Sequence, residues 1–220
     1  MQVQDVKIRV RRSFGDESSV QVTDADLLRW INDGQREVVM QNPELLEKTS
    51  QTNAVAGTSV YTLPTDLRQL RSLKFQNSAG LAYFHLQGLS VQEFDEYIDG
   101  YDGSLFGQAD PVVYCTFAGA ITVFPTPAAN VTNGFKLYYY RQPTDMVNDT
   151  DVLDLPLGYH AAVVEYSLKQ AYELDEDWTS VGNKAQEFNA AVAGQKAQEK
   201  SHNRESYTRI TVCREDEDWY

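Results

Sequence analysis

Hydrophobic side chains recur at three- and four-residue spacing between residues 22 and 42, and this spacing predicts an amphipathic helix. Thr23 stands at the N-cap position. Asp24 and Asp26 follow in the first turn, where carboxylates meet the positive end of the helix dipole. Pro43 ends the helix. The apolar stripe consists of Leu27, Leu28, Ile31, Gly34, Val38 and Val39. The glycine in this stripe allows a neighbouring element to approach closely.

The first residues show the same periodicity, which predicts a short helix from Gln2 to Phe14 that ends at Gly15. The valine and isoleucine content leaves a strand as the alternative. Basic residues stand between the apolar ones. In a chain of this acidity we expect them to form a solvated face or to pair with acidic neighbours, and contact with nucleic acid is the weaker alternative. They are Lys7, Arg9, Arg11 and Arg12.

From Pro43 onward the pattern changes to short alternating runs, which predict strands. Residues 77–80 and 118–119 predict the turns of two hairpins, and 49–57 predicts a loop or a weak strand. Ser90 and Glu93 form a capping box, so we expect a short helix over 90–98, followed by an irregular glycine-rich stretch. The predicted strands are Ser59–Leu63, Arg71–Phe75, Leu81–His85, Val112–Phe117, Ile121–Phe124 and Phe135–Arg141.

Three consecutive tyrosines, Tyr138 to Tyr140, stand in the most strand-like run. Successive side chains of a strand point to opposite faces, so rings are expected on both faces of the sheet. Either all three rings cover a small sheet, or one face contacts a partner.

After Pro156 the helical spacing returns, and the next helix is apolar on two sides, which is typical of a central helix with several neighbours. A final helix begins near Trp178 and is expected to extend to about Asn203. Its stripe turns polar at Gln195 and Glu199, so we expect it to run past the core of its own subunit. The apolar part of the stripe, a candidate protein interface, consists of Trp178, Val181, Ala185, Phe188 and Val192.

The segment from Glu205 to Tyr220 is too apolar for a solvated tail. Burial of its large side chains alone does not offset the entropy lost on ordering so many residues. We therefore interpret it as a partner-binding arm, able to add a strand to a neighbour's sheet edge. Its candidate interface residues are Tyr207, Ile210, Val212, Trp219 and Tyr220.

These elements predict an α+β fold. Residues 1–48 and 150–204 would form a helical bundle core, from the N-terminal helices and two long C-terminal helices. Residues 49–149 would form an inserted antiparallel β-rich domain, and 205–220 an extended C-terminal arm.

Composition changes this picture little. The 220 residues are 42% hydrophobic and 23% charged, as in ordinary globular proteins. No apolar run approaches the roughly 20 residues that cross a bilayer, and no secretory signal is recognisable at the start. Cys115 and Cys213 are best interpreted as reduced thiols. The net charge of −13 argues against a protein that grips phosphate backbones over a wide face.

The sequence contains no phosphate-binding loop, dinucleotide fingerprint, zinc-protease motif or nucleophile elbow. His85, His160 and His202 lie in different segments, and a structural histidine is the better interpretation of His160. A triad of Cys115, His160 and a carboxylate has no local support. The acidic run over 93–102 does not have the spacing of an EF-hand loop. We therefore predict no catalytic, cofactor-binding or metal-binding residue.

The order of features resembles the head-to-tail adaptor proteins of short-tailed bacteriophages, also called head-completion or connector proteins. The resemblance covers about residues 6–203 and rests on the segments RRSFGDES, VQVTDADLLRWINDGQREV, SVYTLPTDLRQLRSL, SVQEFDEY, DPVVYCTFAGAITVFPTP, KLYYYRQPTD and LPLGYHAAVVEYSLKQAYELDED.

The resemblance implies a non-catalytic virion protein, assembled in the bacterial cytoplasm, that forms a homo-oligomeric ring of about twelve subunits under the portal protein. Such a ring extends the DNA channel without specific DNA binding and carries the tail nozzle and fibres. Its helical part makes the ring and its β part faces tail components. Two alternatives are a tail-associated hydrolase and a nucleic-acid-binding protein that uses the basic N-terminal helix.

Overall fold

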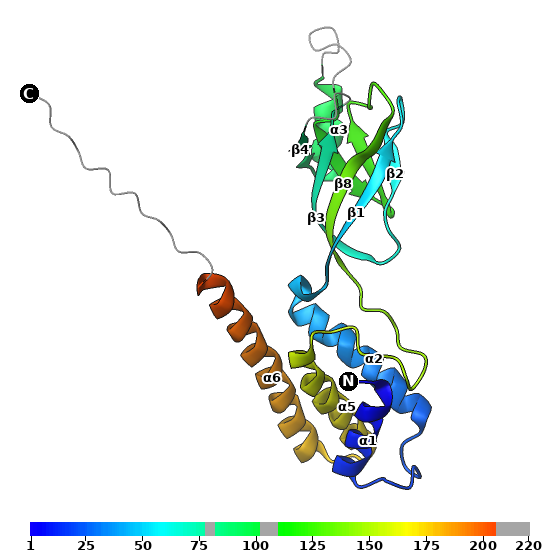
Figure 1. The fold of residues 1–220 in the computed structure, drawn as a ribbon, viewed down its shortest axis with the longest axis vertical. Coiled ribbons are helices and arrows are strands. Elements are labelled where there is room, and N and C mark those ends of the chain that lie inside the picture. The colour runs from blue at the N-terminus through cyan, green and yellow to red at the C-terminus, as the bar shows by residue number, and fades with distance from the viewer. Residues whose placement is uncertain (78–81, 102–109, 206–220) are drawn as a thin grey trace, which may run out of the picture. The chain divides into compact units, whose positions relative to one another are not determined.

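The computed structural model describes residues 1–77, 82–101 and 110–205, and the chain divides into two compact units (Figure 1). The helical unit contains Met1–Asn42 and the chain from Asp145 onward. The β unit is Pro43–Thr144. The described residues form five α-helices and two sheets, so the predicted α+β class is confirmed.

In the helical unit, α5 packs against the three other helices. Its buried side chains come from two sides of the helix and include Ala162, Val164 and Leu168. A short 3-10 turn, η2, precedes it. The elements of this unit are α1 (Val3–Phe14), α2 (Asp24–Gln41), η2 (Leu157–Tyr159), α5 (His160–Leu174) and α6 (Trp178–Glu205).

Helix α2 begins as its sequence predicts, since the Thr23 hydroxyl accepts a hydrogen bond from the Asp26 amide at 3.1 Å. The predicted stripe is buried except for Leu28, which is only half-buried. Trp30 and Gln35 are buried as well. Gln35 fits because its side-chain oxygen accepts a hydrogen bond from the Asp154 amide at 2.8 Å. The buried face is therefore wider than the apolar spacing indicates.

The N-terminal segment is a helix, and the strand alternative is wrong. Val3, Val6 and Val10 are buried on one face. Gly15 ends α1 in the left-handed conformation with φ of 88°, and its amide donates to the Arg11 carbonyl at 2.8 Å.

The β unit contains two four-stranded sheets, with strand orders β1-β8-β3-β4 and β2-β7-β6-β5. One core cluster draws Leu73, Phe135 and Leu137 from the first sheet and Ile121 and Val123 from the second, so the two sheets pack face to face. The elements are η1 (Pro43–Leu46), β1 (Glu47–Ala54), β2 (Val60–Thr62), β3 (Leu67–Gln76), β4 (Tyr83–His85), β5 (Gln87–Gly88), α3 (Val91–Asp99), β6 (Val113–Phe117), β7 (Ala120–Phe124) and β8 (Val131–Arg141).

Two features of the β unit depart from the sequence prediction. Of the two alternatives for residues 49–57, the strand holds for 49–54, but β1 begins earlier, at Glu47, and pairs with β8 along most of its eight residues. Polar residues are tolerated there because β1 is an edge strand with one solvated face. In addition, β5 pairs with β6 in parallel, so the unit is not built from antiparallel hairpins alone.

The second predicted hairpin is confirmed: β6 and β7 pair antiparallel across Ala118 and Gly119, which both have positive φ. β3 and β4 also pair antiparallel, although their predicted turn lies largely outside the described residues. The capping box of α3 is confirmed, with Ser90 and Glu93 bonded reciprocally. The glycine-rich stretch over 102–109 and the arm over 206–220 lie outside the described residues.

Candidate functional site

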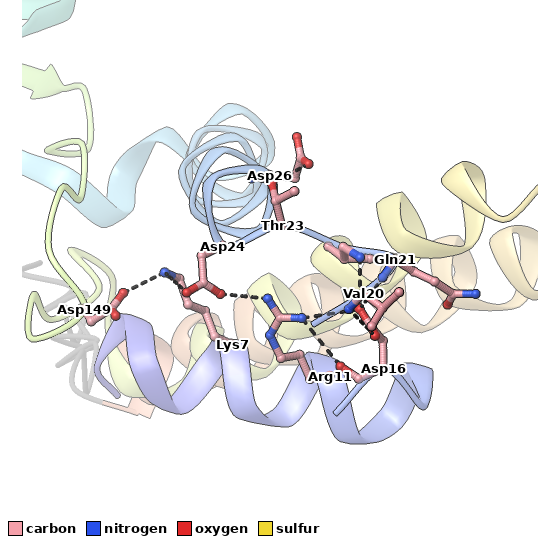
Figure 2. Close-up of polar contacts among 10 residues, drawn as sticks. Lys7, Arg11, Asp16, Val20, Gln21, Thr23, Asp24, Asp26 and Asp149 are labelled. Carbon is pink, nitrogen blue, oxygen red and sulfur yellow. Dashed lines mark hydrogen bonds and ion pairs between the residues drawn. The ribbon is translucent and has the colours of Figure 1, made fainter. Parts of the chain in front are cut away.

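Two of the four basic residues of α1, Lys7 and Arg11, are turned toward acidic partners (Figure 2). Lys7 is only 8% exposed, and its ammonium group donates to Asp149 at 2.6 Å and lies 4.0 Å from Asp24. The Arg11 guanidinium donates to Asp24 at 2.7 Å and lies 3.4 Å from Asp16. The pKa of the Asp24 carboxyl is lowered, chiefly by its hydrogen bond with Arg11. These pairs join α1 to α2 and to the segment that enters α5.

Asp16 organises the loop between α1 and α2. Its buried carboxylate accepts hydrogen bonds from three backbone amides, those of Val20 at 2.9 Å, Gln21 at 3.1 Å and Val22 at 2.9 Å (Figure 2). The pKa of this carboxyl is lowered, with the Val22 amide as the largest cause and Arg11 as a further one. The loop is thereby folded around an ionised side chain.

The expectation that basic residues of α1 pair with acidic neighbours is thus confirmed for Lys7 and Arg11. Arg9 and Arg12 are exposed. With two of its four cations occupied inside the unit, α1 offers a poor phosphate-binding face, because non-specific affinity for DNA depends on the number of phosphates that are neutralised.

The candidate interface on α6 is only partly exposed. Phe188 and Val192 are buried within the helical unit, and the Phe188 ring meets that of Tyr166 on α5 with centroids 5.6 Å apart. Val181 and Ala185 are half-buried, whereas Trp178 at the start of the helix is 69% exposed. The five candidates of the arm lie outside the described residues. The interface role of all ten remains a prediction.

The polar end of α6 does not leave its own subunit where we expected. The Glu199 carboxylate accepts hydrogen bonds from the Tyr159 hydroxyl at 3.0 Å and from the Asn42 amide at 3.4 Å. The Lys196 ammonium group donates to the Gln41 carbonyl at 3.1 Å. The sequence prediction was wrong here because polar residues in the stripe meet polar partners at the end of α2 and before α5. Burial raises the pKa of Tyr159 to about 12, so this hydroxyl is a donor at neutral pH.

His160 is a satisfied buried histidine, as the sequence indicated. Its Nε2 lies 2.8 Å from the Leu155 carbonyl, which can only accept, so Nε2 donates. Its Nδ1 then accepts from the Met1 amino group at 3.1 Å. Burial lowers the pKa of the imidazole. With both nitrogens engaged, this ring is poorly placed to act as a general base.

The β unit carries a surface that combines Tyr138, one of the three strand tyrosines, with residues that the sequence did not single out. On the face of β8 opposite the core, the Tyr138 ring has the ammonium groups of Lys74 at 5.1 Å and Lys136 at 5.2 Å from its centroid. Lys136 also lies 5.8 Å from the Tyr83 ring. We call these four half-buried residues the Tyr–Lys row. The alternation of Lys136, Tyr138 and Tyr140 in β8 was the available signal, but the partners come from β3 and β4.

Beside the Tyr–Lys row lies a hollow of about 250 Å³, smaller than the roughly 300–1,000 Å³ typical of small-molecule sites. An ion pair between Arg71 and Glu47 lies at this hollow. Lys48 pairs with Asp66 at 2.7 Å, and Asp66 also accepts from the Tyr139 hydroxyl at 3.0 Å. The lining residues are Glu47, Lys48, Thr49, Arg71, Tyr138 and Tyr139.

Within residues 1–77, 82–101 and 110–205, no cluster of three or more histidine, cysteine or carboxylate side chains is placed to hold a metal ion. Burial raises the pKa of the Cys115 thiol, which disfavours the nucleophilic thiolate. No helix in the same part of the chain is both long and apolar enough to span a membrane.

The fold defines a protein of mixed α+β class, in which ion pairs and polar hydrogen bonds join the helices. A family model described as SU10 adaptor protein matches residues 1–212. The chain therefore belongs to the SU10 adaptor protein family, a family of structural phage proteins that associate with other head and tail proteins. The resemblance to phage head-to-tail adaptors is thereby confirmed, and the chain is a virion component. No curated protein matches the chain.

Proposed function

We propose that this protein is the head-to-tail adaptor of a short-tailed phage. About twelve copies form a closed ring that docks on the portal, extends the DNA channel and supports the tail nozzle and fibres. The observation that carries this proposal is the adaptor family match, which spans every described element of both units. In this role the protein positions other proteins and catalyses no reaction.

The proposed division of labour follows the predicted domains. With the boundaries moved to those of the two compact units, residues 1–42 and 145–204 form the helical core that makes the ring, 43–144 face tail components, and 205–220 form a partner-binding arm. Within the helical unit, Trp178 is the best-supported contact residue, because its indole is 69% exposed and Leu174, at the end of α5, is 56% exposed. Tryptophan is over-represented among residues that dominate binding energy at protein interfaces.

The negative net charge of the chain is compatible with lining a channel through which DNA passes without being bound. With a net charge of −13, copies arranged in a ring repel a phosphate backbone that comes within a Debye length, about 8 Å at physiological salt. The pairing of Lys7 and Arg11 inside the helical unit supports this role, since it removes two cations that would otherwise attract DNA.

The test is to mix the purified full chain with its phage's portal assembly and to measure the mass and projection images of the product. We expect a portal-bound ring of about twelve copies with a central channel. Trp178→Ala should weaken ring formation, whereas Met40→Ala, which shortens a 61% exposed side chain on α2, should not. Monomers that persist without binding the portal would contradict the proposal.

A further inference from the structure

The exposed side of α1 carries two cations that the helical unit does not neutralise. Arg9 and Arg12 are exposed, and within the part of the chain that the structure describes neither forms an ion pair. Ile8 lies beside them on the same side of the helix and is 41% exposed. We call Ile8, Arg9 and Arg12 the cationic face. The other lysines and arginines whose side chains the structure describes in this unit bond to its own oxygen atoms, and they are Lys7, Arg11, Arg29, Arg36, Lys169, Lys184 and Lys196.

The turn between α5 and α6 carries complementary groups. Leu174 is 56% exposed and Trp178 is 69% exposed, so two large apolar side chains of this turn face solvent. Asp175 and Glu176 lie between them in the sequence and are exposed, and neither forms an ion pair with any residue that the structure describes. We call these four residues the acidic turn. Like the cationic face, it combines apolar and charged side chains, but its charge has the opposite sign.

The acidic turn has a fixed backbone. Glu176 is in the left-handed conformation with φ of 57°, and its amide donates to the Glu173 carbonyl at 3.3 Å. The Asp177 amide donates to the Tyr172 carbonyl at 3.1 Å, which completes the hydrogen-bond pattern that ends α5. The Asp177 carboxylate in turn accepts from the Ser180 amide at 3.2 Å, at the start of α6. A surface that is ordered before binding loses less conformational entropy when a partner docks.

The two surfaces do not neutralise each other within one copy. Both belong to the helical unit, yet among the described residues no ion pair joins an arginine of the cationic face to a carboxylate of the acidic turn. A second copy presents the same two surfaces, so each surface has its complement there. A contact between two different surfaces of identical subunits is the heterologous kind that generates rings.

We propose that the acidic turn of one copy docks on the cationic face of a second copy. Trp178 packs against Ile8, and the two carboxylates of the turn approach Arg9 and Arg12. The opposite charges on the two surfaces set the orientation of the contact, and the apolar side chains are buried between them. This inference rests on the proposed function, because it supplies the adaptor ring with one of its subunit contacts.

The first experiment uses the full chain with Trp178→p-benzoylphenylalanine, a photo-crosslinker that keeps an aromatic side chain at this position. Equal amounts of isotope-labelled and unlabelled chain are mixed, assembled on the portal, irradiated and digested. Mass spectrometry should find crosslinks to residues 8–12, including crosslinks that join a labelled peptide to an unlabelled one. Crosslinks that join only peptides of the same isotope would place the contact inside one copy and overturn the proposal.

Charge reversal tests which groups make the contact. Arg9→Glu with Arg12→Glu should weaken association between copies about tenfold, because weak attractions become repulsions of similar size at both positions. Asp175→Arg with Glu176→Arg should weaken it similarly from the other side. An equal mixture of these two variants should assemble again, because each copy then meets neighbours of opposite charge at both of its surfaces. Recovery in the mixture also shows that both variants are folded.

Two further variants separate this contact from a general effect of charge. Arg9→Lys with Arg12→Lys keeps both charges and should retain assembly. Lys74→Glu with Lys136→Glu makes the same change in net charge on the β unit as the reversal on α1 does, and it should leave association between copies unchanged. Association of the unaltered chain should weaken as ionic strength rises.

Assembly that survives both charge reversals, or an equal mixture of the two variants that does not assemble, would overturn the docking proposal. A portal-bound ring of about twelve copies with crosslinks elsewhere would leave the adaptor function standing and refute this contact. Copies that crosslink as expected but do not bind the portal would leave the contact standing and refute the adaptor function.

Discussion

Gly34 on α2 and Gly182 on α6 allow one chemical change to be compared at a crowded and an open helical position. A Cβ atom added at Gly34 would lie 3.2 Å from Cδ1 and 3.4 Å from Cβ and Cγ of Tyr166. A Cβ atom added at Gly182 would meet nothing within 4 Å. Replacing glycine by alanine inside a helix stabilises it by about 0.5–1 kcal/mol when no contact changes.

We therefore expect Gly182→Ala to raise the free energy of unfolding by about 0.5–1 kcal/mol. Gly34→Ala has the same intrinsic gain, but crowding in a packed core typically costs about 1–3 kcal/mol. The Cβ and Cγ of Tyr166 lie close to its backbone and cannot swing away, so α2 and α5 must move apart. The expected net effect of Gly34→Ala is a loss of about 1 kcal/mol, the difference between these two terms.

Urea unfolding at one fixed protein concentration, followed by helical circular dichroism, measures both variants. Tyr166→Ala removes the ring atoms that crowd position 34, so Gly34→Ala in that background should become stabilising, with a coupling of about 1–2 kcal/mol. If Gly34→Ala stabilises the protein as much as Gly182→Ala does, the close approach of α2 to Tyr166 does not limit packing and the reasoning fails.

Three other predictions concern polar groups. Tyr159→Phe should lower the free energy of unfolding by about 1.5–3 kcal/mol, because Glu199 loses a hydrogen bond and the end of α6 becomes less firmly held. Rapid amide exchange at the end of α6 in the unaltered protein would contradict this. The pKa of His160 is lower in the folded protein than its ordinary value of 6.5. At pH values just below 6.5 the unfolded chain therefore binds more protons than the folded chain, so the free energy of unfolding should decline as the pH falls from 6.5. His160→Gln should flatten this part of the measured pH profile, and an unchanged slope would refute the assignment. Asp16→Asn should lower thermal stability at neutral pH, with the difference from the unaltered chain narrowing as pH drops below 3.8 toward the lowered pKa of Asp16; a pH-independent difference would count against it.

Periodicity predicted the helical elements well because their burial follows simple apolar spacing. The buried valines of α1, the Thr23 cap and the closeness of Gly34 to a neighbour all appear in the structure. The same reasoning missed the burial of Gln35 and of Lys7, although it anticipated that Lys7 pairs with an acidic residue. Each has a partner far along the chain, Asp154 for Gln35 and Asp149 for Lys7, and spacing within a single segment carries no information about such partners.

The β unit was harder to predict for the same reason. β1 is made mainly of polar residues, and its partners in β8, from Tyr140 opposite Glu47 to Val131 opposite Ala54, lie far along the chain, so neither its length nor its register has a local signal. The Tyr–Lys row could not be found from spacing alone. Tyr138 was recognised as one of three strand tyrosines, but the two lysines that flank its ring come from different strands.

The polar contacts of α6 bear directly on how a ring of these subunits would form. The sequence predicts an interface along one continuous stripe from Trp178 to Val192. In the structure, Phe188 and Val192 of this stripe are buried within the subunit. Glu199 is also engaged through Tyr159, so the helix is held at both its middle and its polar end. We therefore expect an interface built on α6 to use the exposed residues of the helix, of which Trp178 is one. If such subunits assemble into the proposed ring, a helix that is already held in this way loses less conformational entropy on assembly.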